Sequence, residues 1–130
     1  MSTIRKYIIV DDDHFNNTIC KMMMENTLGG VEIKTFEVPE EGLAFIQNEC
    51  TKSLLPITVF LDINMPTLNG WEFIEQYEKF SEDVKKQISI YILSSSVDPR
   101  DKDKADANKY IKGFISKPLQ SEVILSIAYV

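Results

Sequence analysis

Five short runs of apolar residues, rich in β-branched and aromatic side chains, are spaced along the chain. The run ITVFL is continuously apolar, as a strand buried on both of its faces requires. We therefore predict five strands, at YIIV (7–10), VEIKTF (31–36), ITVFL (57–61), ISIYIL (88–93) and YIKGFI (110–115).

The stretch after the first run, HFNNTICKMMMEN (14–26), has the periodicity of a helix. The following Leu-Gly-Gly is a typical helix stop. The three methionines at 22–24 are adjacent, so not all of them can face the core. Filling gaps in a core is the ordinary role of methionine. The residues predicted to share one apolar side are Phe15, Ile19, Met22 and Met23, with the polar Asn26 near the end.

Four further stretches are predicted helices. PEEGLAFIQNE (39–49) starts with a proline followed by acids, a favourable helix start. GWEFIEQYEKF (70–80) has an apolar face of Trp71, Ile74 and Tyr77, flanked by Phe73. PRDKDKADANK (99–109) is highly charged, as a solvated helix is, and QSEVILSIAYV (120–130) has an apolar face.

Strand and helix therefore alternate five times along the sequence. This alternation predicts parallel strands joined by right-handed crossovers, with helices on both faces of one sheet. We see no internal repeat, low-complexity segment or linker, and 130 residues suit one domain. The predicted fold is a single doubly wound α/β domain, in which ligands bind beyond the carboxyl ends of the strands.

Composition and charge limit the classes of function that the chain could have. A hydrophobic fraction of 44% is that of a folded protein, and the net charge of −6 disfavours nucleic-acid binding by this chain alone. The sequence shows no signal peptide and no apolar run that would span a bilayer. Cys20 and Cys50, without a CxxC motif, are typical of reduced thiols, so we expect a cytoplasmic protein.

Charged and polar side chains follow four of the five predicted strands. Each alone is more often a turn or capping residue, or a solvated cation. Together they converge on one edge of the sheet. They are Asp11, Asp12 and Asp13 after the first strand, Asp62 after the third, Ser94 after the fourth and Lys117 after the fifth.

Crowded carboxylates do not all stay ionised without a counter-cation, and Mg²⁺ prefers such oxygen ligands. The metal and Lys117 would present positive charge to an incoming phosphoryl group, and Asp62 would act as the nucleophile. The plain interpretation of Asp13 is a cap of the first helix. His14, the only histidine, is interpreted as a surface residue rather than a metal ligand or phosphorelay site.

The pieces IIVDDD, VFLDINMPTLNG, YILSSS and FISKP occur in this order, each at its own predicted strand. In these pieces the sequence resembles a response-regulator receiver domain of two-component signalling, of the single-domain chemotaxis type. The resemblance covers essentially all of residues 1–130, with no output domain. It implies a five-stranded parallel sheet in the flavodoxin-like order 2-1-3-4-5.

The resemblance also implies which residues form the acceptor and the metal site. Asp62 matches the phosphoryl acceptor and also belongs to the metal site. Asp12 matches the acid that ligates Mg²⁺ directly, and Asp11 the one that contacts it through water. Asn64 matches the residue that offers its backbone carbonyl to the metal.

Further matches concern the phosphoryl group and the switch. Lys117 and Ser94 match the residues that contact the phosphoryl group, and Phe114 matches the aromatic switch position. Phe114 has no hydroxyl, so its switch would work through packing. Asn64 and Ser96 occupy the variable positions that tune hydrolysis in this family, and the resemblance implies a cis peptide at Lys117–Pro118.

The implied function is a Mg²⁺-dependent phosphoacceptor switch. A sensor histidine kinase or a histidine phosphotransfer protein would donate to Asp62, and the chain would later dephosphorylate itself. Ser94 would move inward and Phe114 would follow. The domain would work as a monomer or a phosphorylation-dependent dimer, without binding nucleic acid or membrane.

Two other functions stay open at this point. One is a protein-binding module on a receiver scaffold that is never phosphorylated, against which the complete set of acidic, hydroxyl and lysine positions argues. The other is a metal-dependent phosphatase acting on outside substrates. Its chemistry would want an acid or base two residues past the nucleophile, where this chain has Asn64.

Overall fold

A computed structural model of the protein describes residues 5–49 and 56–128. It contains one five-stranded sheet in the order β2-β1-β3-β4-β5. All neighbouring strands are parallel. This confirms the predicted sheet and its flavodoxin-like order. The strands are β1 (Lys6–Val10), β2 (Glu32–Phe36), β3 (Ile57–Leu61), β4 (Ile88–Ser94) and β5 (Ile111–Ser116).

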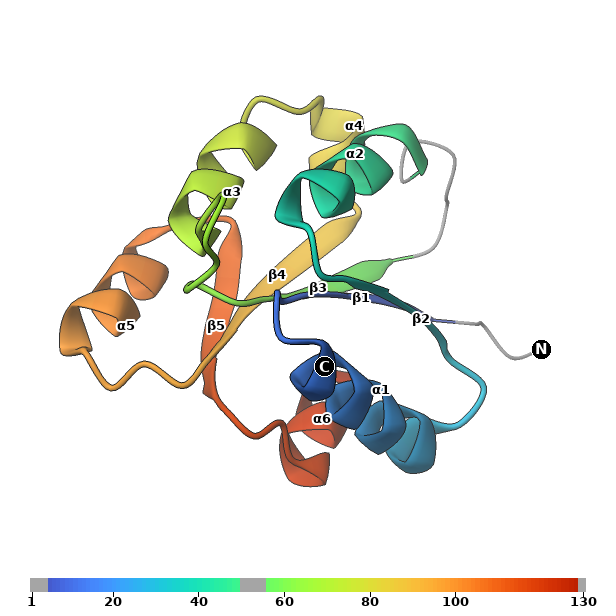
Figure 1. Ribbon diagram of the computed structural model, residues 1–130. Coiled ribbons are helices and arrows are strands. Elements are labelled where there is room, and N and C mark those ends of the chain that lie inside the picture. The colour runs from blue at the N-terminus through green and yellow to red at the C-terminus, as the bar shows by residue number, and fades with distance from the viewer. Residues whose placement is uncertain (1–4, 50–55, 129–130) are drawn as a thin grey trace.

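Helices cover both faces of the sheet, as Figure 1 shows. Helices α1 (His14–Leu28) and α6 (Ser121–Ala128) lie side by side on one face. On the opposite side lie α2 (Pro39–Glu49), α3 (Gly70–Tyr77) and the short α4 (Glu82–Lys85), with α5 (Pro99–Ala107) packed beside β5. No helix in the described ranges is long and apolar enough to cross a membrane.

The strands divide their side chains between two hydrophobic cores because successive residues of a strand point to opposite faces. Ile8 and Val10 of β1 belong to the core under α2, α3, α4 and α5. Tyr7 and Ile9 of the same strand belong to the core under α1 and α6. The central strands contribute apolar side chains to both cores, which explains why their sequences are mostly apolar.

The predicted apolar side of α1 was largely wrong, since of its apolar members only Met23 packs, partly buried, against the core under α1 and α6. Phe15, Ile19 and Met22 are exposed by 73%, 42% and 57% of their surfaces. The buried side of α1 consists of Asn17, Cys20 and Met24. Both sets of residues have helical spacing, but the buried set contains the polar Asn17 and so does not read as an apolar side in the sequence. Its side chain is buried because its Nδ2 donates to the Asp11 carbonyl, 2.8 Å away.

The helix ends follow their sequence signals closely. Asp13 caps α1 by accepting from the backbone N–H groups of Phe15 and Asn16, and Gly29 follows the helix at a φ of 62°. The sequence did not predict α4. Its Lys85 is buried, with Nζ donating to the Glu78 carbonyl at 2.9 Å.

Candidate functional site

The backbone brings the ends of β1 and β3 into contact. The Asp62 N–H donates to the Val10 carbonyl at 2.9 Å, which extends the ladder between these strands by one residue. On the other side of β1, the Asp11 N–H donates to the Phe36 carbonyl at 3.0 Å. Backbone hydrogen bonds therefore place Asp11 and Asp62 at adjacent strand ends.

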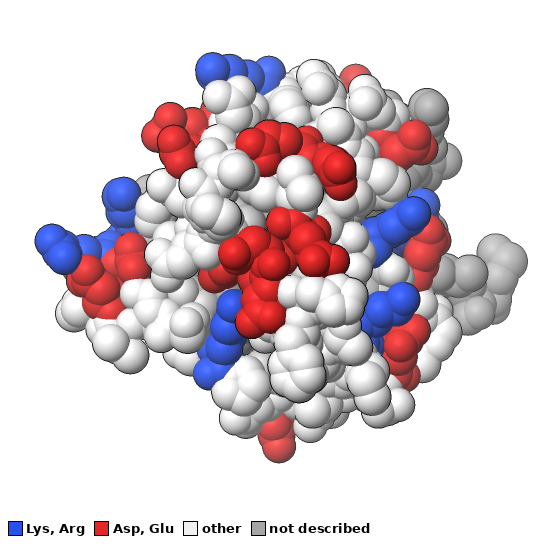
Figure 2. Space-filling view, viewed as in Figure 1, with Lys and Arg blue, Asp and Glu red and all other residues white. Residues whose placement is uncertain are grey.

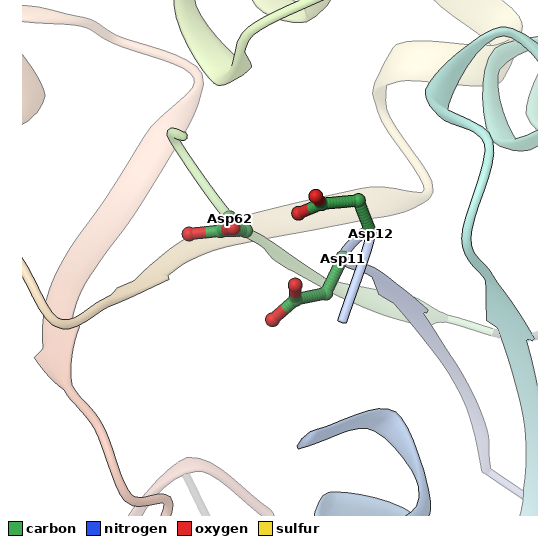
Figure 3. Close-up of side chains that lie close together, drawn as sticks. All are labelled: Asp11, Asp12 and Asp62. Carbon is green, nitrogen blue, oxygen red and sulfur yellow. The ribbon is translucent and has the colours of Figure 1, made fainter. Parts of the chain in front are cut away.

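Three aspartates meet at these strand ends. One carboxylate oxygen from each of Asp11, Asp12 and Asp62 lies within 4.8 Å of the other two. Figure 3 shows the three side chains gathered where β1 and β3 end. Asp11 and Asp62 are buried, whereas Asp12 is exposed, so the cluster opens to solvent on one side. Asp and Glu side chains also crowd the centre of the face seen in Figure 2.

Lys117 supplies a cation to this cluster from the loop after β5. Its Nζ lies 2.7 Å from Asp11 Oδ2 and 3.7 Å from Asp62 Oδ1. The peptide bond between Lys117 and Pro118 is cis. The Lys117 backbone N–H donates to the Ser94 carbonyl at 3.0 Å, which joins this loop to the end of β4.

The electrostatics of Asp62 are unusual. Burial, and then the negative charge of Asp11, raise the pKa of Asp62 to about 6, against the opposing effects of Lys117 and of backbone hydrogen bonds from Asn64 and Ile63. Burial by itself lowers the pKa of Lys117. The hydrogen bond and charge of Asp11, helped by the charge of Asp62, outweigh burial and raise it. Lys117 is thus charged while Asp62 titrates close to neutrality.

Ser94 ends β4, the strand next to β3, and is fully buried. Its Oγ accepts from the Ser96 N–H at 3.0 Å. The Ser96 hydroxyl in turn donates to Asp101 Oδ2 at 2.6 Å, so it points toward the first turn of α5. Phe114, on β5, is partly buried against the core under α2–α5.

A glycine brings the start of α3 against the loop that carries Asp62. A Cβ at Gly70 would lie 2.6 Å from the Asp62 carbonyl oxygen and 2.8 Å from Ile63 Cα. The Gly70 N–H donates to the Ile63 carbonyl at 2.8 Å. Only glycine permits this close approach, which fixes the loop holding the nucleophile candidate.

The donor set fits a hard divalent cation. Mg²⁺ prefers carboxylate, carbonyl and water oxygens, and Asp11, Asp12 and Asp62 offer three carboxylates at one point. Burial and then the charge of Asp11 raise the pKa of Asp62 although Lys117 lies 3.7 Å away, so a further cation would favour its ionised form. Asn64, expected to offer its carbonyl, is exposed two residues past Asp62 in the same loop.

Two asparagines of α1 that hold Asp11 were not among the predicted site residues. Asn16 Nδ2 donates to Asp11 Oδ2 at 2.7 Å, and Asn17 Nδ2 donates to the Asp11 carbonyl. The available signal was their place five and six residues after Asp11, as the third and fourth residues of the helix that directly follows the acids. Cys20, behind them, is buried, and burial and then the charge of Asp11 raise the pKa of its thiol to about 11, which favours the protonated thiol.

The fold and this cluster define the class of protein. The model of the response regulator receiver domain matches residues 7–129, so the chain belongs to this family. The sequence matches no curated protein.

Solved structures agree with this assignment. The chain is similar to a receiver protein from Dyadobacter fermentans, with 26% identity, a TM-score of 0.87, and coverage of 95% of this chain and 94% of the other. It is also similar to a two-component response regulator from Cytophaga hutchinsonii, with 29% identity, a TM-score of 0.87, and coverage of 98% of this chain and 96% of the other. A third similar structure is the chemotaxis response regulator CheY4 of Vibrio cholerae, with 26% identity, a TM-score of 0.71, and coverage of 97% of each chain.

Proposed function

We propose that this receiver accepts a phosphoryl group on Asp62 in a Mg²⁺-dependent reaction and later removes it by catalysing its own hydrolysis. The donor is the phosphohistidine of a sensor histidine kinase or a histidine phosphotransfer protein, in the cytoplasm. The observation that carries the proposal is the meeting of Asp11, Asp12 and Asp62 within 4.8 Å, with the Lys117 ammonium 2.7 Å from Asp11. The proposal holds whether the domain works alone or within a longer chain.

The residues divide the chemistry between them. An ionised Asp62 oxygen attacks phosphorus, the P–N bond breaks, and its electron pair stays on the leaving imidazole. Asp11, Asp12 and Asp62 with the Asn64 carbonyl would hold Mg²⁺, which would supply positive charge that offsets the phosphoryl oxygens. Lys117, already 3.7 Å from Asp62 Oδ1, pairs with a second phosphoryl oxygen.

The response to phosphorylation begins at Ser94. Its Oγ accepts one hydrogen bond from Ser96, which leaves its hydroxyl proton to donate to a phosphoryl oxygen. Because Ser94 and Lys117 are joined through the backbone, a movement of Ser94 reaches the loop after β5. Phe114, on the neighbouring strand, then repacks, and the surface beyond it changes.

The test is phosphorylation by acetyl phosphate or phosphoramidate with Mg²⁺, followed by mass spectrometry of the intact protein. We expect one added phosphoryl group on the wild type and none on Asp62→Asn. Asp103→Asn, which changes an exposed aspartate of α5, is the matched control and should be modified like the wild type. Equal modification of the wild type and Asp62→Asn would exclude Asp62 as the acceptor.

A Mg²⁺ titration separates this function from a binding module that is never phosphorylated. A working acceptor site should give a saturable rise of the melting temperature with Mg²⁺, because the ion binds only the folded cluster. An idle site should give none. Phosphotransfer from candidate kinases of the same genome then identifies the donor.

A further inference from the structure

The carboxylate of Asp11 is held by three donors on two oxygens. Its Oδ1 accepts from the Asp13 N–H at 2.9 Å. Its Oδ2 accepts both from Lys117 Nζ and from Asn16 Nδ2, each at 2.7 Å. Two different groups, one charged and one neutral, therefore share a single oxygen of a side chain that is 2% exposed.

We propose that Asn16 is a positioning residue, which keeps the Asp11 carboxylate in the metal site both while Lys117 shares its Oδ2 and after Lys117 moves toward the phosphoryl group. This inference rests on the proposed function and deepens it, since it assigns a role to a residue outside the acceptor, metal-ligand and phosphoryl-contact positions. Asn16 touches neither metal nor phosphoryl group. It acts through Asp11.

The position of Asn16 is rigid, as such a role requires. It lies in the first turn of α1, and its own N–H donates to Oδ1 of the capping residue Asp13 at 3.3 Å. Asn17, the next residue, fixes the Asp11 backbone by donating to its carbonyl at 2.8 Å. The start of α1 thus holds both the main chain and the side chain of Asp11.

The shared oxygen explains why a neutral donor is useful here. Lys117 bridges Asp11 and Asp62. In the proposed reaction its ammonium shifts toward a phosphoryl oxygen, which lengthens its contact with Asp11. If Lys117 were the only donor to Asp11 Oδ2, that buried oxygen would lose its partner, at a cost in free energy. Asn16 remains bound to it, so Asp11 does not have to turn away from the metal.

The experiment measures Mg²⁺ affinity, with Mg²⁺ itself as the probe, by calorimetric titration of the full chain. Asn16→Ala and Asn16→Leu both remove the amide, and leucine keeps most of the volume. We expect each to weaken Mg²⁺ binding about tenfold, as loss of a partner of a metal-ligating side chain typically does. Thr18→Ala, at an exposed position of the same helix, is the control and should match the wild type.

Two further measurements separate positioning from a general structural role. Without Mg²⁺, the melting temperatures of the Asn16 variants should stay within about 3 °C of the wild type, because alanine and leucine both favour a helix more than asparagine does. In an Asp11→Asn background, titrated at higher Mg²⁺, Asn16→Ala should change the affinity less than about twofold, since the two sites act through one contact.

Three outcomes would overturn the inference. They are Asn16 variants that bind Mg²⁺ as the wild type does, variants that melt far below it, or an Asn16→Ala effect that persists in full without the Asp11 carboxylate. These outcomes are distinguishable from failure of the proposed function. In that case the wild type itself would show no Mg²⁺ binding, or no phosphoryl group on Asp62.

Discussion

Replacing Asp62 by asparagine should stabilise the metal-free protein at neutral pH. The pKa of Asp62 is about 6 in the folded protein, against an ordinary value of 3.8. Ionised Asp62 therefore costs folding free energy that a neutral amide of the same shape does not. One unit of pKa corresponds to about 1.4 kcal/mol, so the full shift gives about 3 kcal/mol as an upper bound.

Solvent reduces this value. Asp12, at the mouth of the cluster, is exposed, and water near the carboxylates screens part of their repulsion. The Asp62→Asn variant also loses the 3.7 Å approach to Lys117, which keeps its closer contact with Asp11. We expect Asp62→Asn to raise the free energy of unfolding by about 1–3 kcal/mol at pH 7.5 in EDTA.

The pH dependence gives the sign of the effect. Because the pKa of Asp62 is higher in the folded protein than in the unfolded chain, the folded protein binds more protons between about pH 4 and pH 6, and its stability falls as the pH rises through this window. The advantage of asparagine should therefore shrink to about half at pH 5 and vanish below about pH 4. Lys117, whose pKa is raised, does not titrate in this range.

Urea denaturation followed by circular dichroism measures the difference. Asp103→Asn, an exposed change, should stay within about 0.5 kcal/mol of the wild type. Saturating Mg²⁺ should shrink the advantage of the variant, because the wild type keeps all three acids and gains about 2.7 kcal/mol at one hundred times its dissociation constant. An Asp62→Asn protein no more stable than the wild type in EDTA at pH 7.5 would refute the reasoning.

Three further predictions concern packing and ionisation. In urea denaturation, Met24→Ala should lower the free energy of unfolding by about 2–4 kcal/mol, because Met24 is fully buried. Met22→Ala should lower it by less than about 0.5 kcal/mol, because Met22 is 57% exposed. Equal losses would contradict the observed buried side of α1. Gly70→Ala should cost about 1–3 kcal/mol and weaken Mg²⁺ binding, since its Cβ would meet backbone at 2.6 Å. Gly42→Ala, whose Cβ would meet only a side chain at 3.1 Å, should cost less, and the opposite ranking would exclude the clash as the cause. At low Mg²⁺, the initial rate of phosphorylation by acetyl phosphate should fall as the pH drops through about 6, because Asp62 must be ionised to attack. Mass spectrometry measures this rate. A rate that does not change between pH 5 and pH 8 would count against the prediction, and so would a fall that saturating Mg²⁺ does not move to lower pH.

The sequence predicted the sheet because its signal is local. A run such as ITVFL needs no knowledge of its neighbours to be assigned as a buried strand. The predicted site followed from the sheet, since parallel strands place their carboxyl ends on one edge. Asp11, Asp12, Asp62 and Lys117 indeed lie together there.

The buried side of α1 was not predictable by the same method. Phe15, Ile19 and Met22 form a regular apolar stripe, and periodicity alone favours burying it. The chain instead buries Asn17, because a hydrogen bond to the Asp11 carbonyl satisfies its amide nitrogen inside the protein. Rotating the helix to meet this bond leaves the apolar stripe in solvent.

The orientation of α1 thus follows from contacts with the site as well as from hydrophobic burial. Asp13 starts the helix, Asn16 and Asn17 bind Asp11 one turn later, and Cys20 and Met24 continue that side into the core. Burial of Met24 contributes favourable free energy to the orientation that places the two asparagines against the acid. The hydrophobic core under α1 therefore stabilises the geometry of a carboxylate cluster whose own repulsion opposes folding.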